Sequence, residues 1–215
     1  MARVLIGNVY PSDEYLLQRC APAGFGLGYA TLLTANDNLN SINKNGWYHW
    51  ESEAAPANAP TMSYTTYMNV MRVWTNDGGV CCQELMDMSD STIRGTKIQR
   101  IIYGPNVFPW EWVNPPMISG IEYCTTERYM SKPVYTKLVN VGAYPESGLR
   151  NVDTGIVATG IVRFHAASGN YTLPIAGNME INIQQSNGKL EVQLNTKGER
   201  ITANDIYVTL YYIKD

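Results

Sequence analysis

The chain has 215 residues, of which 16% are charged, and a net charge of −3. This length allows one large or two modest domains, and the charge excludes the basic surface typical of nucleic-acid binding. No apolar run approaches the roughly 20 residues that span a bilayer, so we expect no membrane insertion. The opening MARVLIGNVY lacks the apolar stretch of a signal peptide, so we expect synthesis in a reducing cytosol.

The cysteines and histidines show no disulfide or metal-binding pattern. They are Cys20, Cys81, Cys82, Cys124, His49 and His165. Adjacent cysteines are poorly placed for a mutual disulfide, no CxxC pair occurs, and neither histidine has a cysteine at ligand spacing. We therefore expect free thiols, no metal ion and no cofactor.

The N-terminal part of the chain contains the best helix candidate. SDEYLLQRC, residues 12–20, has Ser12 as an N-cap residue, and Pro22 ends the pattern. After this segment, short β-rich runs alternate with glycine, proline and asparagine, a pattern typical of an all-β protein.

The C-terminal third predicts strands over residues 134–141, 156–166 and 206–213, besides the two arms of a hairpin. In the hairpin, Asn187-Gly188 separates the alternating runs NMEINIQQ and KLEVQLN, and both turn positions require a positive φ. On 206–213, Val208, Leu210 and Tyr212 form one face. The other face, Tyr207, Thr209 and Tyr211, is half-polar and suits contact with another sheet or subunit. We therefore expect these strands to form a small antiparallel β-sandwich.

Two prolines at Pro115-Pro116 indicate a boundary, because neither can donate a ladder hydrogen bond. All five tryptophans lie before this point. The predicted division is an N-terminal segment with a short helix at 1–20, a β-rich domain at 21–114 and a β-sandwich at 117–215.

Aromatic residues near WYHW (47–50) and FPWEW (108–112) are the main candidates for a binding site. Indole faces stack on sugar rings, and nearby asparagine amides bind hydroxyls without the desolvation cost of a charge. The competing interpretation is that these rings form the core of a loop-rich domain. The predicted ligand-binding residues here are Tyr48, Trp50, Trp110 and Trp112.

No motif for catalysis stands out. GFGLG (24–28) lacks the lysine and hydroxyl residue of a phosphate-binding loop, and no GxSxG occurs. Carboxylate pairs for glycoside hydrolysis cannot be placed from sequence spacing. We expect a protein that is not an enzyme.

Several stretches, taken in order, resemble one family. APAGFGLG (21–28), NDNLNSINKNGWYHW (36–50) and WEWVNPPM (110–117) resemble the pyocin-knob-like modules of phage and tailocin tail fibres. Residues 122–156 resemble the start of a C-terminal head found in tail proteins, and YVTLYYIKD resembles its last strand. On this resemblance, Asn45-Gly46 makes the turn of the first knob hairpin, with Leu39, Ile42 and Trp47 facing inward, so that Tyr48, His49 or Trp50 faces out.

The resemblance implies a homotrimeric receptor-binding protein of the virion tail, assembled in the bacterial cytoplasm and released by lysis. It would bind a host surface polysaccharide or protein receptor, and residues 1–20 would attach it to a baseplate or another tail protein. The chain departs from the head pattern at Tyr144, Arg150 and Asp153-Thr154. Such heads vary most where they meet the receptor, and Tyr144 is a further predicted ligand-binding residue. The alternatives are a glycan depolymerase of the tail and a purely structural tail-tip or baseplate component.

Overall fold

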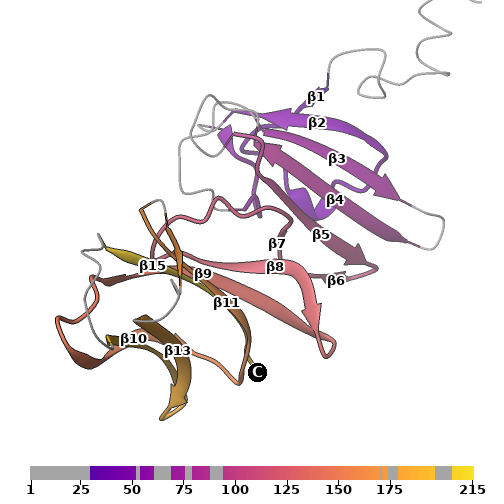
Figure 1. Ribbon diagram of the computed structural model, residues 1–215. Helices are drawn as coiled ribbons and strands as arrows, with labels where there is room; N and C mark the ends of the chain where they lie inside the picture. Colours follow the sequence, from indigo (N-terminus) through magenta and orange to yellow (C-terminus); the bar gives the residue numbers. More distant parts are fainter. Residues whose placement is uncertain are drawn as a thin grey trace, which may run out of the picture. The chain divides into compact units, whose positions relative to one another are not determined.

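The computed structural model describes residues 30–51, 54–60, 69–75, 79–87, 94–169, 171–173, 179–196 and 205–215. The chain divides into two compact units, Met1–Asn114 (unit 1) and Pro115–Asp215 (unit 2). Almost every regular element in the described ranges is a β-strand, which confirms the all-β prediction (Figure 1). The helix predicted at 12–20, the attachment segment 1–20 and the glycine run 24–28 lie outside the described residues. No helix within those ranges is long and apolar enough to cross a membrane.

Unit 1 is built on one sheet and a 3₁₀ turn. The elements are β1 (Thr31–Leu32), η1 (Leu39–Ser41), β2 (Gly46–Trp50), β3 (Asn69–Thr75), β4 (Val80–Asp87), β5 (Lys97–Tyr103), β6 (Asn106–Val107) and β7 (Glu111–Trp112). The strand order is β1-β2-β3-β4-β5-β7, and β6 pairs with β5. The β1–β2 pair is parallel, whereas the pairings from β2 to β5 are antiparallel.

One face of the unit 1 sheet is buried because alternate residues of its strands point to the same side. On β4, burial alternates strictly from Val80 to Asp87. The buried cluster consists of Leu33, Leu39, Trp50, Val73, Cys81, Leu85, Ile98 and Ile102. The 3₁₀ turn η1 contributes Leu39 to this core, and the side chain of Asn38 caps η1 by accepting a hydrogen bond from the Asn40 backbone N–H.

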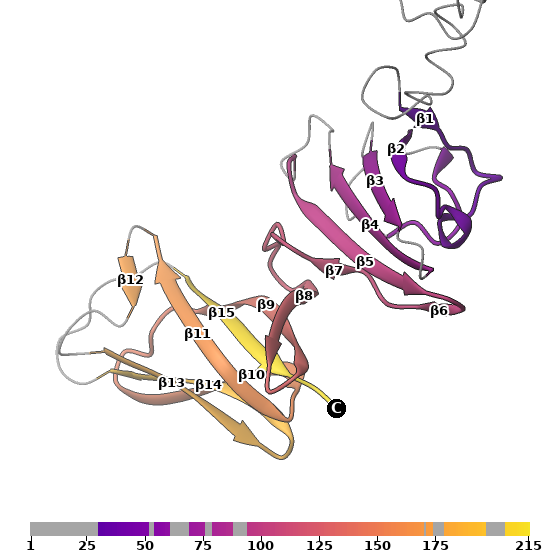
Figure 2. The same cartoon turned by 90° about the vertical axis from the view of Figure 1, so that its right-hand side faces the viewer.

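Unit 2 is a β-sandwich, as predicted. Its strands are β8 (Glu122–Tyr129), β9 (Lys132–Gly142), β10 (Gly148–Val157), β11 (Gly160–Ser168), β12 (Tyr171–Leu173), β13 (Met179–Ser186), β14 (Lys189–Thr196) and β15 (Ile206–Ile213). One sheet has the order β8-β9-β15-β11-β12 and the other β10-β14-β13. The two sheets lie face to face (Figure 2), and a cluster of buried side chains from both fills the space between them.

The β13–β14 hairpin confirms the prediction made from Asn187-Gly188. The strands pair from Met179↔Thr196 to Ser186↔Lys189. Both turn residues have positive φ, 50° at Asn187 and 76° at Gly188. These values fit the two-residue hairpin turn that twists with the strands it joins.

The single strand predicted over 156–166 is wrong, because the chain changes sheets in the middle of it. β10 ends at Val157 and β11 begins at Gly160. Between them, the Ala158 N–H donates to the Gly188 carbonyl at 3.4 Å, and the Thr159 N–H donates to the Ile213 carbonyl at 2.8 Å. Gly188 belongs to the hairpin of one sheet and Ile213 to the other, so two consecutive residues carry the chain from layer to layer.

The last strand has the two faces expected from its sequence. Val208, Leu210 and Tyr212 are each 0% exposed and lie in the sandwich core. Tyr207 on the opposite face is 40% exposed, and Thr209 and Tyr211 are half-buried. This outward face is therefore the polar-aromatic side of the larger sheet.

Candidate functional site

Trp50 is a core residue, not a surface residue. It is 2% exposed and belongs to the buried cluster of unit 1, so its ring has no free face for a ligand. Trp47, expected to face inward, is 36% exposed. Both corrections have one cause: the alternation of β2 puts Gly46, Tyr48 and Trp50 on the core side and Trp47 on the other.

The predicted hairpin turn at Asn45-Gly46 is also wrong. Gly46 is the first residue of β2, which pairs with β1 in parallel and with β3 in antiparallel orientation. The Asn45 side-chain oxygen instead accepts a hydrogen bond of 3.2 Å from the Thr75 hydroxyl. Asn45 therefore fastens the start of β2 to the end of β3.

Tyr48, Trp110 and Trp112 come together around the core of unit 1, against which all three pack while half-buried. The Tyr48 hydroxyl donates to the Lys44 carbonyl at 2.8 Å, and burial, with a smaller contribution from Cys81, raises its pKa. The Trp110 indole N–H donates to the Asn58 carbonyl at 3.2 Å. These rings thus have structural partners, which favours the core interpretation of the aromatic cluster.

A buried arginine lies beneath Trp110. Arg100 is 4% exposed, its Cζ lies 4.4 Å from the centroid of the Trp110 ring, and its Nε donates to Gln83 Oε1 at 2.8 Å. The Gln83 amide in turn donates to the carbonyls of Leu39 at 2.6 Å and Ile42 at 2.9 Å. Burial lowers the pKa of Arg100 to about 10, so the guanidinium stays charged at neutral pH. This network joins η1, β4 and β5.

Tyr144 is buried in unit 2 rather than placed at a surface. It is 3% exposed, and its hydroxyl has no hydrogen-bond partner among the described residues. Burial raises its pKa to about 12. Arg150, close by in sequence, donates through Nη2 to the carbonyls of Val141 at 2.5 Å and Ala143 at 2.6 Å, which fixes the connection between β9 and β10.

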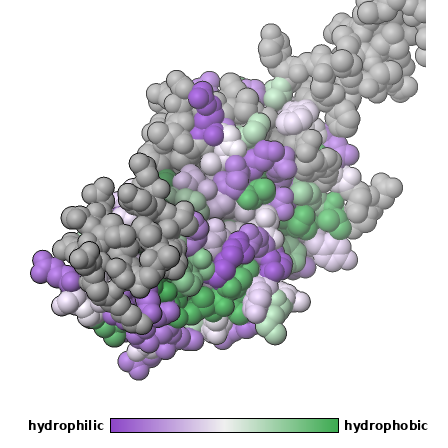
Figure 3. All heavy atoms as spheres, in the orientation of Figure 1, coloured by the Kyte–Doolittle hydropathy of each residue, from purple (hydrophilic) through white to green (hydrophobic). Residues whose placement is uncertain are grey.

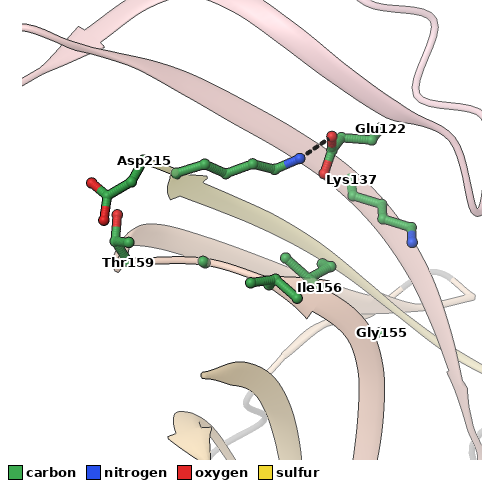
Figure 4. A pocket seen from close by; sticks show the side chains of 9 residues that line it. Glu122, Lys137, Gly155, Ile156, Thr159 and Asp215 are labelled. Carbon is green, nitrogen blue, oxygen red and sulfur yellow. Dashed lines mark hydrogen bonds and ion pairs between the residues drawn. The ribbon is translucent and has the colours of Figure 1, made fainter. Parts of the chain in front are cut away.

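A pocket lies in unit 2, at the bend between the two sheets (Figure 4). It has a volume of about 530 Å³. Its lining residues are Glu122, Lys137, Gly155, Ile156, Val157, Ala158, Thr159, Lys214 and Asp215. Strands β8 and β9, the end of β10 with the bend that follows it, and the residues after β15 all contribute, so the site exists only once the sandwich has closed.

The carboxylates of this pocket are already engaged. Glu122 accepts hydrogen bonds from the Tyr212 hydroxyl and from the Lys214 ammonium. Burial and the contact with Glu122 raise the pKa of Tyr212 well above its ordinary value, so the phenol remains a donor. Asp215 Oδ1 pairs with Lys132 Nζ at 2.6 Å.

Aromatic rings pack beside the polar wall of the pocket, which consists of Glu122, Lys214 and Asp215. Lys214 Nζ lies 4.6 Å from the centroid of the Tyr135 ring, and the Tyr135 and Tyr212 rings stack with centroids 6.2 Å apart. The Lys214 ammonium is therefore held between a carboxylate and a π-face, which fixes its position more firmly than a solvated lysine.

The opposite wall of the pocket is apolar. Ile156 and Ala158 are each 3% exposed and give the wall a fixed base, whereas Val157 is 64% exposed. Gly155 has φ of +67° and open space where a side chain would begin. Hydrophobic residues also gather on the unit 2 part of the face in Figure 3, where Figure 1 draws β9 and β11.

Sequence reasoning missed this pocket. Glu122 and Lys137 lie opposite each other on β8 and β9, but Lys214 and Asp215 are far along the chain. Charged residues this far apart in the sequence form no recognisable motif, and only the register of the sheet brings them together. In the described part of the chain, no group of three or more His, Cys, Asp or Glu residues is arranged to hold a metal ion.

Comparison with known proteins gives two structural neighbours. No protein-family model and no curated protein matches the chain. The structure is similar to a P. aeruginosa R1 pyocin fiber comprising C-terminal residues 323–701, with 12% identity and a TM-score of 0.32 over 86% of this chain and 67% of that one. It is also similar to an N-truncated R2-type pyocin tail fiber, with 8% identity and a TM-score of 0.31 over 84% of this chain and 96% of that one. Both neighbours are tail fibres, the class that the sequence motifs resemble, but likenesses this distant carry no argument about what this chain binds.

Proposed function

We propose that the chain is a non-enzymatic receptor-binding protein of a phage or tailocin tail fibre, which contacts a host cell-surface glycan or protein and mediates adsorption. The observation that carries the proposal is the unit 2 pocket of about 530 Å³, where a polar wall with engaged carboxylates faces an apolar wall. Such a mixture suits an amphipathic ligand such as a sugar ring, which has hydroxyl edges and C–H faces. The ordered tail-fibre-like motifs in the sequence support the same function.

The state of the carboxylates favours binding over hydrolysis. A glycosidase needs one carboxyl group that gives a proton and another that attacks the sugar or activates water. Glu122 is held by Tyr212 and Lys214, and Asp215 is held by Lys132. Carboxylates held by such hydrogen bonds and ion pairs are suited to fixing the pocket wall. A depolymerase would release new reducing ends from a purified host polysaccharide, and we expect none.

The outward face of β11 and β15 suits assembly into a homotrimer. Tyr207, Thr209 and Tyr211 on β15 lie opposite Ala167, His165 and Arg163 on β11. The Arg163 guanidinium lies 3.9 Å from the Tyr211 ring centroid, which gives this face a flat, partly apolar surface. A trimer would present three pockets together, so that avidity compensates for weak single contacts. Light scattering should then give about three times the 24.0 kDa mass of the chain, and residues 1–20 would join the trimer to a baseplate or another tail protein.

Adsorption to cells tests the proposed function directly. The fluorescently labelled full chain is incubated with a panel of Gram-negative and Gram-positive strains, with excess unlabelled chain as the competitor. We expect saturable, competed binding to a subset of strains. A protein that only joins tail parts would bind none of them, and that result would reject receptor binding in favour of the structural alternative.

A further inference from the structure

One lysine of the unit 2 pocket has no carboxylate partner. The charged side chains that line the pocket are those of Glu122, Lys137, Lys214 and Asp215. Lys214 pairs with Glu122, and Asp215 pairs with Lys132, which lies outside the lining, so Lys137 is left without an ion-pair partner among the described residues.

Lys137 is a half-buried residue of β9 whose ammonium makes no hydrogen bond or ion pair within the described residues. Its register partner on β8 is Glu122, but that carboxylate is taken by Tyr212 and Lys214. Figure 4 shows the Lys137 ammonium turned away from Glu122. Lys137 is therefore free to meet a ligand.

The backbone of the neighbouring bend offers few competing donors. The N–H groups of Gly155 and Ile156 donate to the side chains of Asp153 and Thr154, at 2.7 Å and 3.2 Å. Those of Ala158 and Thr159 donate to backbone carbonyls inside unit 2. The bend thus presents mainly apolar surface, and Val157, 64% exposed, is its most accessible part.

We infer that the pocket binds a carboxylate-bearing sugar, such as a uronic or sialic acid residue of a surface glycan. The carboxylate would accept a charge-assisted hydrogen bond from Lys137, and the C–H face of the ring would lie on Val157. A single lysine matches one negative charge, whereas a phosphate monoester carries nearly two and is bound more often by arginine forks. This inference deepens the proposed function and depends on it.

Saturation-transfer-difference NMR on the full chain tests the ligand class. The probes are glucuronate, N-acetylneuraminate, glucose, glucose 6-phosphate and a glutamate-rich peptide. We expect saturable signals from at least one of the two acidic sugars and at least tenfold weaker binding of glucose, because the charge-assisted hydrogen bond is lost. If neither acidic sugar binds, if glucose binds equally well, or if only the phosphate or the peptide binds, the inference is wrong.

Substitutions at two lysines assign the effect to the pocket. Lys137→Gln should weaken binding of the acidic sugar about tenfold or more, and Lys137→Arg, which keeps the charge, should retain most of it. Lys44→Gln removes the same charge from an exposed lysine of unit 1 that is not part of the pocket lining, and it should bind like the parent. Equal binding by Lys137→Gln and the parent would overturn the inference.

The adsorption assay separates this inference from the proposed function. If the parent and Lys137→Gln adsorb equally to the same cells, the carboxylate inference fails while receptor binding stands. If the parent adsorbs to no cells, the proposed function itself fails, whatever the free sugars show.

Discussion

The Tyr212 hydroxyl on β15 donates a hydrogen bond to the carboxylate of Glu122 on β8, across the strand β9 that separates them in the sheet. Tyr212 is 0% exposed and its ring stacks on Tyr135, so the phenol carries a polar contact from the sandwich core to the pocket wall. A side chain of the sandwich core therefore holds a carboxylate of the pocket lining in place.

Tyr212→Phe should lower the free energy of unfolding by about 1–2 kcal/mol, because Glu122 loses a donor while the ring still packs. Chemical denaturation followed by circular dichroism measures the loss. The control is Tyr129→Phe, at a tyrosine of β8 that is 44% exposed, and it should change stability little. Equal stability of the Tyr212→Phe variant and the parent would show that the hydrogen bond contributes nothing.

Gly188→Val should destabilise unit 2 by about 1–3 kcal/mol, since a β-branched residue is strained at the φ of 76° found there. No atom lies within 4 Å of the place where a side chain would begin, so the cost comes from the backbone and not from a clash. Asn187→Gly at the neighbouring turn position should be tolerated. Thermal melts of both variants check the prediction, and an unchanged melt of Gly188→Val would contradict the turn geometry.

Gln83→Leu should destabilise unit 1 by about 2–4 kcal/mol, because the substitution leaves the Leu39 and Ile42 carbonyls and the Arg100 Nε without their partner. Gln99→Leu makes the same chemical change at a half-buried position of β5 and should cost far less. Denaturation monitored by tryptophan fluorescence reports on this unit, which holds all five tryptophans. Similar losses in the two variants would argue against a special role for the Gln83 network.

Tyr144→Phe should change stability by less than about 1 kcal/mol at pH 7, because the buried hydroxyl has no partner among the described residues. At high pH the two proteins should differ. The pKa of Tyr144 is about 12 in the folded chain, against an ordinary value of 10.0. The folded chain therefore holds the proton more tightly, and the stability that this gives is complete below pH 10 and is lost as the pH rises to 12.

The parent should therefore lose on the order of 1–3 kcal/mol more than Tyr144→Phe between pH 10 and 12. Denaturation curves collected across this range measure the difference. Parallel pH profiles would mean that Tyr144 is not shielded from solvent in the folded chain.

The sequence predicted those parts of the fold that depend on local pattern. Alternation placed the strands over 134–141 and 206–213 and the arms of the Asn187-Gly188 hairpin, because one face of each strand is buried. The break at Ala158-Thr159, inside the strand predicted over 156–166, leaves the hydrophobic pattern of IVATGIV unbroken, so no local signal marks it.

The candidate site was harder to predict. In WYHW every residue is aromatic, so alternation indicates that Trp47 and Trp50 face opposite sides but not which of them is buried. The pocket residues Glu122, Lys137 and Lys214 come from three separate elements, and their proximity depends on the register of β8, β9 and β15. No local signal carries that information.

The most direct test of the central claim, that the unit 2 pocket contacts the host surface, is adsorption of a variant that blocks the pocket. Val157→Asp places a negative charge on its exposed apolar wall, while Val107→Asp makes the same change in unit 1 at a valine that is 41% exposed. On cells that bind the parent chain, the proposal predicts that Val157→Asp adsorbs at least tenfold more weakly and Val107→Asp adsorbs like the parent. Equal adsorption of Val157→Asp and the parent would contradict the claim.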